Sequence, residues 1–303
     1  SGGDGISYHN LGILHLKGSG VPLDKEKGIK MLEKACTFSF VGVDIIEQSL
    51  AFLYAEGTIA GQNEYKAFVY AFSSAQRGNT EAMFLLGTFY LKGLGTDKNL
   101  KDGMKWMQKA ATIGDVDAQY YLGWLYESGE YGVEVDISKA MEFYEMASGQ
   151  NDSKAQYNLA MLLQGFDKQP TAVGLLRCAS ERDHVKAQFE LSKCLLAGKG
   201  TKQNLVEAVH WAQLAAQGKL ASAQHALGRF YENGIGVEED DEKAKQMYKL
   251  AADQGLPVAL YDLGILEAAQ GRYAAAKVFF DKALDLGFAS AKEALTQLAQ
   301  VSG

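Results

Sequence analysis

The amino-acid sequence predicts an all-α fold built from stacked pairs of antiparallel helices. A block that begins with alanine recurs at intervals of 32 to 37 residues, with its alanines at Ala82, Ala118, Ala155, Ala187, Ala223, Ala259 and Ala291. A repeat of this length is typical of helical solenoids, in which each unit stacks on its neighbours. The chain also contains 33 glycines but only 3 prolines, which favours helices separated by glycine turns. Alternating β-branched runs of the strand type are scarce.

The first helix of each pair is predicted from apolar residues at helical spacing, as in EAMFLLGTFY (residues 81–90) and SAQHALGRFY (residues 222–231). A small residue recurs in the middle of these helices, at Ala51, Gly87, Gly123, Ala160, Ser192, Gly228 and Gly264. Glycine inside a helix costs about 1 kcal/mol relative to alanine. A position that stays small despite this cost predicts a close approach of two helix backbones.

Two glycines follow the first helix, as in Gly93-Leu94-Gly95. The same pair recurs in other units, at Gly18 and Gly20, Gly198 and Gly200, and Gly234 and Gly236, with a stretched form at residues 129–132. A phosphate-binding loop normally occurs once and follows a strand. The recurrence therefore predicts a turn, in which Gly93 ends the helix with a positive φ.

The second helix of each pair is predicted to begin after an Asp or Asn at a fixed offset. These residues are Asp24, Asn63, Asn99, Asp136, Asn204 and Asp240, and this register predicts six N-caps. Helices of about 12 residues are marginal alone, so the pairs must stack. We expect one domain over residues 1–303, with units at residues 6–36, 45–78, 81–114, 117–150, 153–183, 185–218, 221–255 and 258–287 and a capping helix at residues 289–300.

The unit AQHALGRFYENGIGVEEDDEKAKQMYKLAADQG (residues 223–255) resembles the Sel1-like repeat, a relative of the tetratricopeptide repeat. The resemblance covers about eight units. It implies a right-handed α-solenoid superhelix that serves as an adaptor or scaffold in protein–protein interactions. Three segments depart from the pattern. The turns GFDKQP (residues 165–170) and QGRY (residues 270–273) are short, and residues 37–47 fit the register badly.

The resemblance further implies that the first helices line a concave groove for a peptide or helix of a partner protein. Registered on the family, the groove receives the residue three before the small position, which is His9, Gln48, Phe84, Tyr120, Tyr157, Phe189, His225 or Tyr261. It also receives the residue after the small position, which is Ile13, Phe52, Thr88, Trp124, Met161, Lys193, Arg229 or Ile265.

Within this groove, aromatic residues, Met and Arg are the types that dominate interface energies. We therefore expect the partner to contact Phe84, Tyr120, Trp124, Tyr157, Met161, Phe189, Arg229 and Tyr261. The recurring aromatic residues could equally pack between adjacent units. Trp124, Met161 and Arg229 depart from the repeat, and this departure favours a role in binding.

Charge and cysteine content bound the partners and the compartment. A net charge of −7 disfavours nucleic acid as a partner, and no apolar stretch approaches the roughly 20 residues of a membrane span. Cys36, Cys178 and Cys194 form no C-x-x-C pair. This favours a reduced, cytosolic-type compartment and buried free thiols, although an approach of Cys178 and Cys194 stays open. The first residues, SGGDG, leave open a signal peptide or anchor before them.

No catalytic, cofactor or metal site is expected. The sequence lacks the phosphate-loop, hydrolase, zinc-protease and S-x-x-K motifs, and its five histidines show no i, i+4 pair. The acidic run EEDDEK (residues 238–243) could supply paired carboxylates, but its register favours helix capping. Two alternatives stay open. One is β-lactam binding or hydrolysis, which is linked to cysteine-rich relatives whose paired cysteines this chain lacks. The other is self-assembly into a homo-oligomer.

Overall fold

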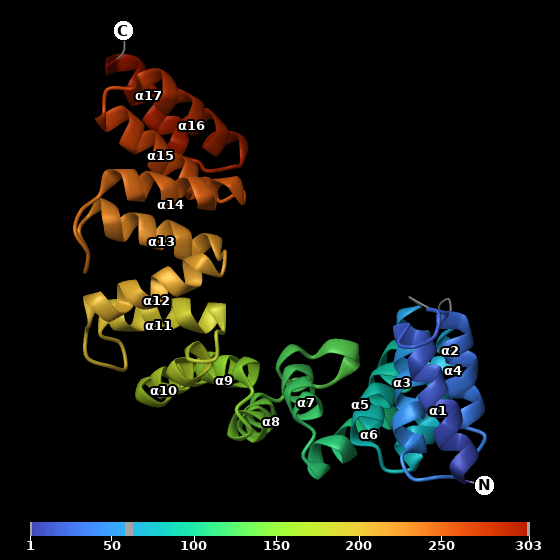
Figure 1. Cartoon of the computed structure of the whole chain (residues 1–303). Helices are drawn as coiled ribbons and strands as arrows, with labels where there is room; N and C mark the ends of the chain where they lie inside the picture. The colour runs from blue at the N-terminus through green and yellow to red at the C-terminus, as the bar shows by residue number, and fades with distance from the viewer. Residues whose placement is uncertain (1, 58–62, 302–303) are drawn as a thin grey trace. The chain divides into compact units, whose positions relative to one another are not determined.

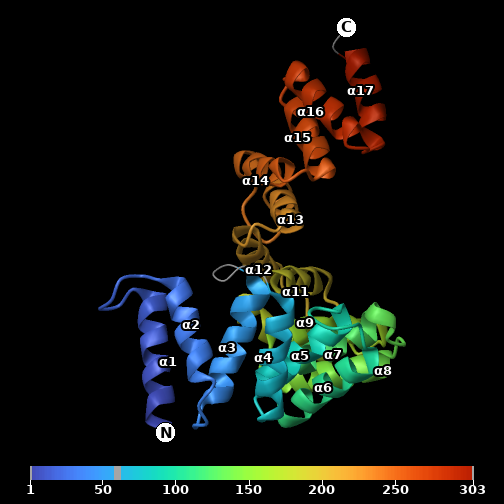
Figure 2. The same ribbon diagram turned by 90° about the vertical axis from the view of Figure 1, so that its right-hand side faces the viewer.

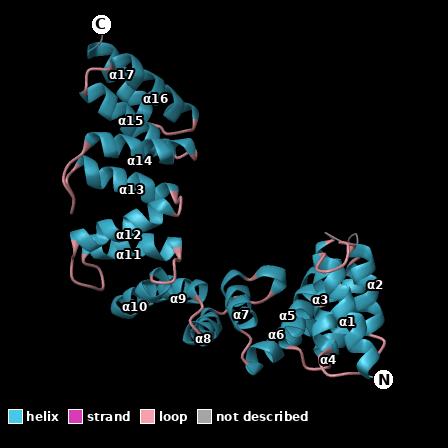
Figure 3. Cartoon of the chain, viewed as in Figure 1, coloured by secondary structure: helices cyan, strands magenta, loops and turns pink. Residues whose placement is uncertain are grey.

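The computed structural model describes residues 2–57 and 63–301, and the regular elements in this part are seventeen α-helices and one short 3₁₀ helix (Figure 3). The predicted all-α fold is therefore confirmed. The chain divides into two compact units, residues 1–150 and 151–303. The expectation of one continuous domain over residues 1–303 stays a prediction. Residues 58–62, inside the predicted repeat at residues 45–78, lie outside the described part.

The first unit contains four helical hairpins, whose first and second members we call A and B helices (Figure 1). They are α1 (Gly2–Lys17) with α2 (Lys25–Ala35), α3 (Val43–Glu56) with α4 (Glu64–Gln76), α5 (Thr80–Lys92) with α6 (Leu100–Ile113), and α7 (Val116–Ser128) with α8 (Ile137–Gly149). The 3₁₀ helix η1 (Glu130–Gly132) lies between α7 and α8. Figure 2 shows α1 to α4 as neighbouring, roughly antiparallel helices.

The second unit contains four more hairpins and a final helix (Figures 1 and 2). They are α9 (Ser153–Gly165) with α10 (Gln169–Ser180), α11 (Val185–Ala197) with α12 (Leu205–Gln217), α13 (Ala221–Glu232) with α14 (Asp241–Asp253), and α15 (Pro257–Ala269) with α16 (Tyr273–Asp285). The last helix, α17 (Ser290–Val301), packs on α16 through Ala291, Ala294 and Leu298. This is the predicted capping helix.

All six predicted N-caps of the B helices are confirmed. Each side chain accepts a hydrogen bond from the backbone N–H three residues later, as Asn99 does from Asp102 at 3.0 Å. The A helices α5, α7, α9 and α11 have side-chain caps as well, formed by Asn79, Asp115, Asp152 and His184. The sequence analysis did not assign these second caps.

The predicted close approach at the small position is also confirmed. A Cβ on Gly87 of α5 would lie 3.0 Å from the carbonyl oxygen of Gly103 on α6, and a Cβ on Gly103 would lie 3.1 Å from that of Gly87. In α7, α13 and α15 the same slot receives an aromatic ring, as Tyr144 packs on Gly123. In these hairpins the A and B helices thus approach closely because the contact position on the A helix is glycine.

The glycine pair has two separate roles in the turn. Gly93 ends α5 in the left-handed conformation with φ 73°, as predicted. Gly95 packs against the carbonyl group of Glu64, the first residue of the preceding B helix, and leaves no room for a Cβ there. Gly200 and Gly236 make the equivalent contact on Gln169 and Leu205. The second glycine therefore seats one hairpin on the hairpin before it.

Two details differ from the expectations. In the stretched turn, Tyr131 adopts φ 56°, a conformation that residues with a side chain rarely adopt. All three cysteines are free thiols, but only Cys194 is buried, whereas Cys178 is exposed on α10. The expectation of a buried thiol was wrong for Cys178, because this residue falls on the outer side of its helix.

Among the described residues, no helix is both long enough and apolar enough to span a bilayer.

Candidate partner-binding surface

Three exposed apolar side chains of the A helices, Phe52, Met161 and Ile265, occupy the register predicted from the sequence. The residue after each small position forms one row, which we call the outer row. In the first unit it consists of Ile13, Phe52, Thr88 and Trp124, and in the second unit of Met161, Lys193, Arg229 and Ile265. Phe52 is 41% exposed, Met161 36% and Ile265 41%. Apolar groups that remain this exposed at equivalent positions mark a candidate binding face.

The recurring aromatic residues are less exposed than Phe52, Met161 and Ile265 of the outer row. Phe84, Tyr120, Tyr157, Phe189 and Tyr261 are all half-buried. Phe84 of α5 packs edge-on against Tyr121 of α7 at 5.7 Å between ring centroids, and Tyr157 of α9 lies 4.9 Å from the ring of His184, which precedes α11. These rings thus help to join consecutive hairpins. Part of each side chain still reaches the surface.

The first unit gathers an aromatic cluster around Tyr121. Trp124 lies 5.2 Å from Tyr121 and Phe84 lies 5.7 Å from it on the other side. The pKa of the Tyr121 hydroxyl is raised by burial and by a hydrogen bond with Tyr131 of the stretched turn. Sequence analysis missed Tyr121 and Tyr131. The signal available was the one extra residue between Gly129 and Gly132, which lengthens this turn relative to the others.

In the second unit, a hydrogen bond takes the place of an aromatic contact. His225 Nε2 of α13 lies 2.6 Å from Asp262 Oδ2 of α15, and both side chains are largely buried. His225 holds the same register position as Phe84, and Asp262 holds that of Tyr121. The two hairpins are therefore joined by a polar contact at this seam. Sequence analysis placed His225 toward the groove but did not identify its partner.

Another histidine of the second unit, His184, has a structural role at the start of α11. His184 Nδ1 accepts a hydrogen bond from the backbone N–H of Ala187 at 3.1 Å and so caps α11. Burial and the nearby Lys186 lower the pKa of His184. The neutral ring is the form that can accept this bond. The histidine is thus a structural cap.

The eight predicted binding residues fall on the two units separately. Phe84, Tyr120 and Trp124 lie on the first unit, and Tyr157, Met161, Phe189, Arg229 and Tyr261 lie on the second. Within the second unit, Met161 and Arg229 belong to the exposed outer row, while the three aromatic residues lie half-buried beside it. Each unit therefore has its own candidate face.

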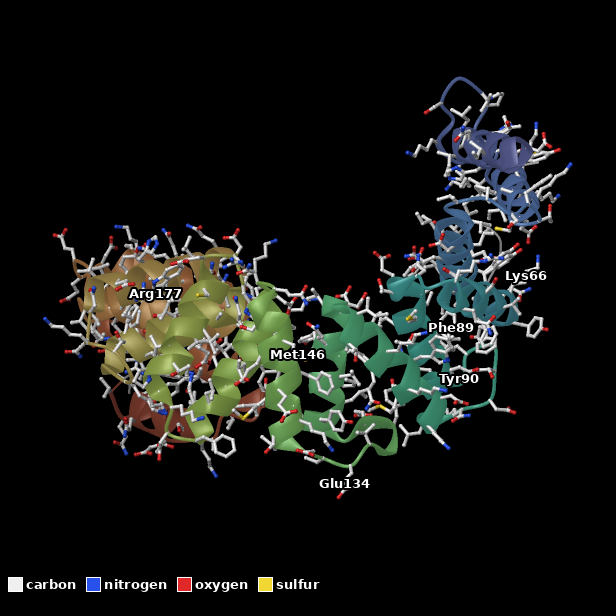
Figure 4. The ribbon with its side chains drawn as sticks, turned by 90° about the horizontal axis from the view of Figure 1, so that it is seen from below. Lys66, Phe89, Tyr90, Glu134, Met146 and Arg177 are labelled. Atoms are coloured by element: carbon white, nitrogen blue, oxygen red, sulfur yellow. The ribbon has the colours of Figure 1, made fainter. Side chains whose placement is uncertain are left out.

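A charged cluster in the first unit is structural rather than reactive. The hydroxyl of Tyr54 donates to Glu33 Oε1 at 2.7 Å. Lys66, labelled in Figure 4, places its Nζ 2.8 Å from the same oxygen. The bond to Glu33 raises the pKa of Lys66, so the amine stays protonated and is a poor nucleophile. The contact of Lys66 with the Tyr54 ring recurs as Lys139 on Tyr126 and Lys243 on Tyr231.

The opposite face of the second unit has furrows between consecutive B helices. One, of about 510 Å³, is lined by residues of α12, α13 and α14, including Leu227, Met247 and Leu250. The next, of about 450 Å³, holds the equivalent place between α14 and α16. The two furrows are equivalent because their lining residues hold the same positions in consecutive repeats. In the described part of the chain, no group of three or more His, Cys, Asp or Glu side chains is placed to hold a metal ion.

Comparison with known proteins shows which repeat this is. The model of the Sel1 repeat matches residues 5–37, 49–79, 80–115, 116–152, 153–184, 185–219 and 221–256. The hairpin α15–α16, expected as the eighth unit, lies beyond these ranges.

Among curated proteins, the chain is 33% identical over 198 residues to chitin synthase regulatory factor 3 of Schizosaccharomyces pombe, which covers 61% of this chain and 21% of that protein. It is 31% identical over 213 residues to the chitin synthase regulator SKT5 of Saccharomyces cerevisiae, which covers 65% of this chain and 30% of that protein. The chain thus spans less than a third of either relative.

Among solved structures, a Sel1 repeat protein from Oxalobacter formigenes superimposes with a TM-score of 0.75 at 26% identity, over 98% of this chain and 88% of that one. This likeness covers both units and agrees with the matched ranges and with the repeated hairpins. The chain belongs to the Sel1 repeat family.

Proposed function

We propose that this chain is a non-catalytic adaptor that holds a segment of a partner protein on the exposed faces of its A helices. Trp124, Met161 and Arg229 contact the partner directly in this proposal. Phe84, Tyr120, Tyr157, Phe189 and Tyr261 contribute the part of each ring that remains exposed. A partner segment would therefore meet a rigid face built on helices, which suits recognition without large rearrangement.

The observation that carries this proposal is the outer row. Its members stand at one register position on consecutive A helices, yet their side chains differ from hairpin to hairpin. Packing between repeats would favour one residue type at such a position, as the small slot shows. Met161 and Arg229 are exposed and Trp124 is half-buried, and all three are types that contribute strongly to interfaces. Variation in an exposed row on an otherwise regular scaffold therefore supports selection for a partner.

The relatives support a regulatory role. Both chitin synthase relatives are named as regulators, and the aligned parts cover most of this chain. Their own target is not assigned to this chain, which shares less than a third of their length. The proposal takes from them only that Sel1 repeats occur in proteins that act on other proteins.

The test uses a phage-displayed library of random 16-residue peptides, selected on the intact chain. The affinity of the tightest peptide is then measured for Met161→Ala and for the matched variant Met146→Ala. Met146 is 43% exposed on the B helix α8 (Figure 4), so both changes remove a similar exposed side chain. Trp124→Ala and Arg229→Ala complete the set, with Lys249→Ala of α14 as the cationic control.

We expect an A-face change to weaken binding by about tenfold or more, which corresponds to roughly 1.4 kcal/mol. The B-face controls should stay within about twofold, because small surface changes away from a contact have little effect. Failure to select any peptide, or equal losses for Met161→Ala and Met146→Ala, would contradict the proposal. Circular dichroism and the melting temperature confirm that each variant is folded.

A further inference from the structure

The A helices of the second unit carry an unusual set of exposed cations. Lys154 lies on α9, Lys186 and Lys193 lie on α11, and Arg229 lies on α13. The outer-row residue of α9 is Met161. Lys154 and Lys186 each stand seven residues before an outer-row residue, and seven residues make about two helical turns. The cations therefore share the face of the outer row, with Tyr157 and Phe189 between the two levels.

The acids of the same A helices are each engaged within the chain. Lys193 Nζ lies 2.7 Å from Glu190, the hydroxyl of Tyr248 donates to Glu232 at 2.6 Å, and Asp262 pairs with His225. Glu267 is buried against Lys245 and Arg272. Each of these carboxylates thus has a partner within the chain, while Lys193, whose side chain is 54% exposed beside Glu190, still reaches the surface. Lys186 and Arg229 make no side-chain hydrogen bond or ion pair with the residues that the structure describes.

The first unit has a more acidic balance than the second, whose A helices carry four lysines and arginines and four acids. Its four A helices carry seven acidic residues, Asp4, Asp44, Glu47, Glu56, Glu81, Asp117 and Glu127, and two lysines, Lys17 and Lys92. The cations of the second unit are therefore a local feature, which the repeat pattern does not require. On a chain with a net charge of −7, a cationic face of this kind is complementary to a negatively charged ligand.

We propose that the A face of the second unit recognises an acidic peptide segment of a partner protein, with apolar residues on both sides of the acids. Carboxylates of the segment meet Lys193 and Arg229, and its apolar ends meet Met161 and Ile265. This inference rests on the proposed adaptor function and adds the chemistry of the partner. The exposed methionine and isoleucine favour a peptide over nucleic acid, whose backbone offers charge but no apolar side chains.

The spacing of the hairpins suggests the pattern of the segment. Packed helices lie about 8–10 Å apart, and an extended chain advances about 3.3 Å per residue. One step between outer-row residues therefore corresponds to about three residues of an extended peptide. A segment that crosses α9, α11, α13 and α15 would carry, in order, an apolar residue, an acid, a second acid and a second apolar residue. Two further residues would stand between each of these and the next.

The test examines the peptides selected from the random library and the double variant Lys193→Glu/Arg229→Glu. We expect the selected peptides to be enriched in acids about three residues apart, flanked by apolar residues. Their affinity should fall at least tenfold in the double variant and stay within twofold in Lys249→Glu, which makes the same charge change on a B helix. Peptides with Lys in place of the acids should bind the double variant more tightly than the original chain. If the double variant is unstable, the peptide affinity of Arg229→Gln, which only removes a charge, is measured in its place.

The outcomes separate this inference from the function on which it rests. Selected peptides that lose affinity in Met161→Ala but lack acids, or that ignore the double variant, would overturn the acidic segment and leave the adaptor role intact. If no peptide is selected, both proposals fail. A 20-nucleotide single-stranded RNA that binds as tightly as the peptides and competes with them would overturn the peptide assignment in favour of nucleic acid.

Discussion

The carbonyl oxygen of Gly103 lies so near Gly87 that a Cβ on Gly87 would be only 3.0 Å away from it. The two glycines face each other across the hairpin of α5 and α6, and each excludes a side chain on the other. The same relation joins Gly12 and Gly28 in the first hairpin. Glycine is therefore retained in these helices because it permits close packing of the backbones, despite its low helix propensity.

Gly87→Ala should destabilise the chain, whereas Gly174→Ala should stabilise it. A Cβ at Gly87 would crowd Gly103 and Met107, while a Cβ at Gly174 of α10 would meet nothing within 4 Å. Alanine gains about 1 kcal/mol of helix propensity at either site, but overpacking costs roughly 1–3 kcal/mol at Gly87. Thermal unfolding of both variants checks this. An increase in the melting temperature of Gly87→Ala would contradict the packing role.

Gly95→Ala should cost more stability than Gly20→Ala. Both glycines have a positive φ, 68° and 74°, so alanine meets the same backbone strain of about 1–2 kcal/mol at each. Only Gly95 packs on another hairpin, where a Cβ would overlap the carbonyl group of Glu64, whereas Gly20 has open space. The difference between the two free energies of unfolding measures the contact between hairpins. Equal losses would show that the second glycine serves the turn alone.

Acid should weaken the junction of α14, α15 and α16 through Glu267. The hydrogen bond from Arg272 and the contact with Lys245 outweigh burial and lower the pKa of this carboxyl below its ordinary 4.5. The unfolded chain therefore binds the proton more readily than the folded chain. The stability that this group contributes is fully present above about pH 4.5 and is lost as pH falls through the lowered pKa.

Glu267→Gln tests this linkage. The variant should lose about 1–3 kcal/mol near pH 7, since two cations are left without their partner, and its melting temperature should decline less than that of the original chain below pH 4.5. Asp281→Asn is the control, because the exposed pair of Asp281 with Lys277 should contribute less than about 1 kcal/mol. Parallel acid profiles of Glu267→Gln and the original chain would refute the assignment.

The sequence was informative where one residue type recurs at a fixed offset. The N-cap Asn99, the turn residue Gly93 and the small position Gly87 were predicted because each depends mainly on its own hairpin. The pairing of His225 with Asp262 was not predicted, since it joins residues 37 positions apart on different hairpins. The contact of Tyr131 with Tyr121 was missed as well, because it depends on the path of an irregular turn.

The sequence predicted which positions of the A helices form the candidate site, but not how deeply each side chain is buried. Sequence placed the aromatic residues and the outer row on the A helices, and the structure distinguishes the half-buried Phe84 from the exposed Met161. This distinction depends on how far each ring reaches toward the next hairpin, as Phe84 does toward Tyr121. Periodicity alone carries no information about that distance. The charge balance of the second unit likewise became visible only once the partners of its acids were known.

The most direct test of the adaptor account is the methyl NMR spectrum of the eight methionines while a selected peptide is added. Met161 of the A helix α9 and Met146 of the B helix α8 have similar exposed fractions, 36% and 43%, and report on opposite helix types. The account predicts that the methyl signal of Met161 shifts in proportion to the bound fraction while that of Met146 stays unchanged. A shift of Met146 with no change at Met161 would contradict it.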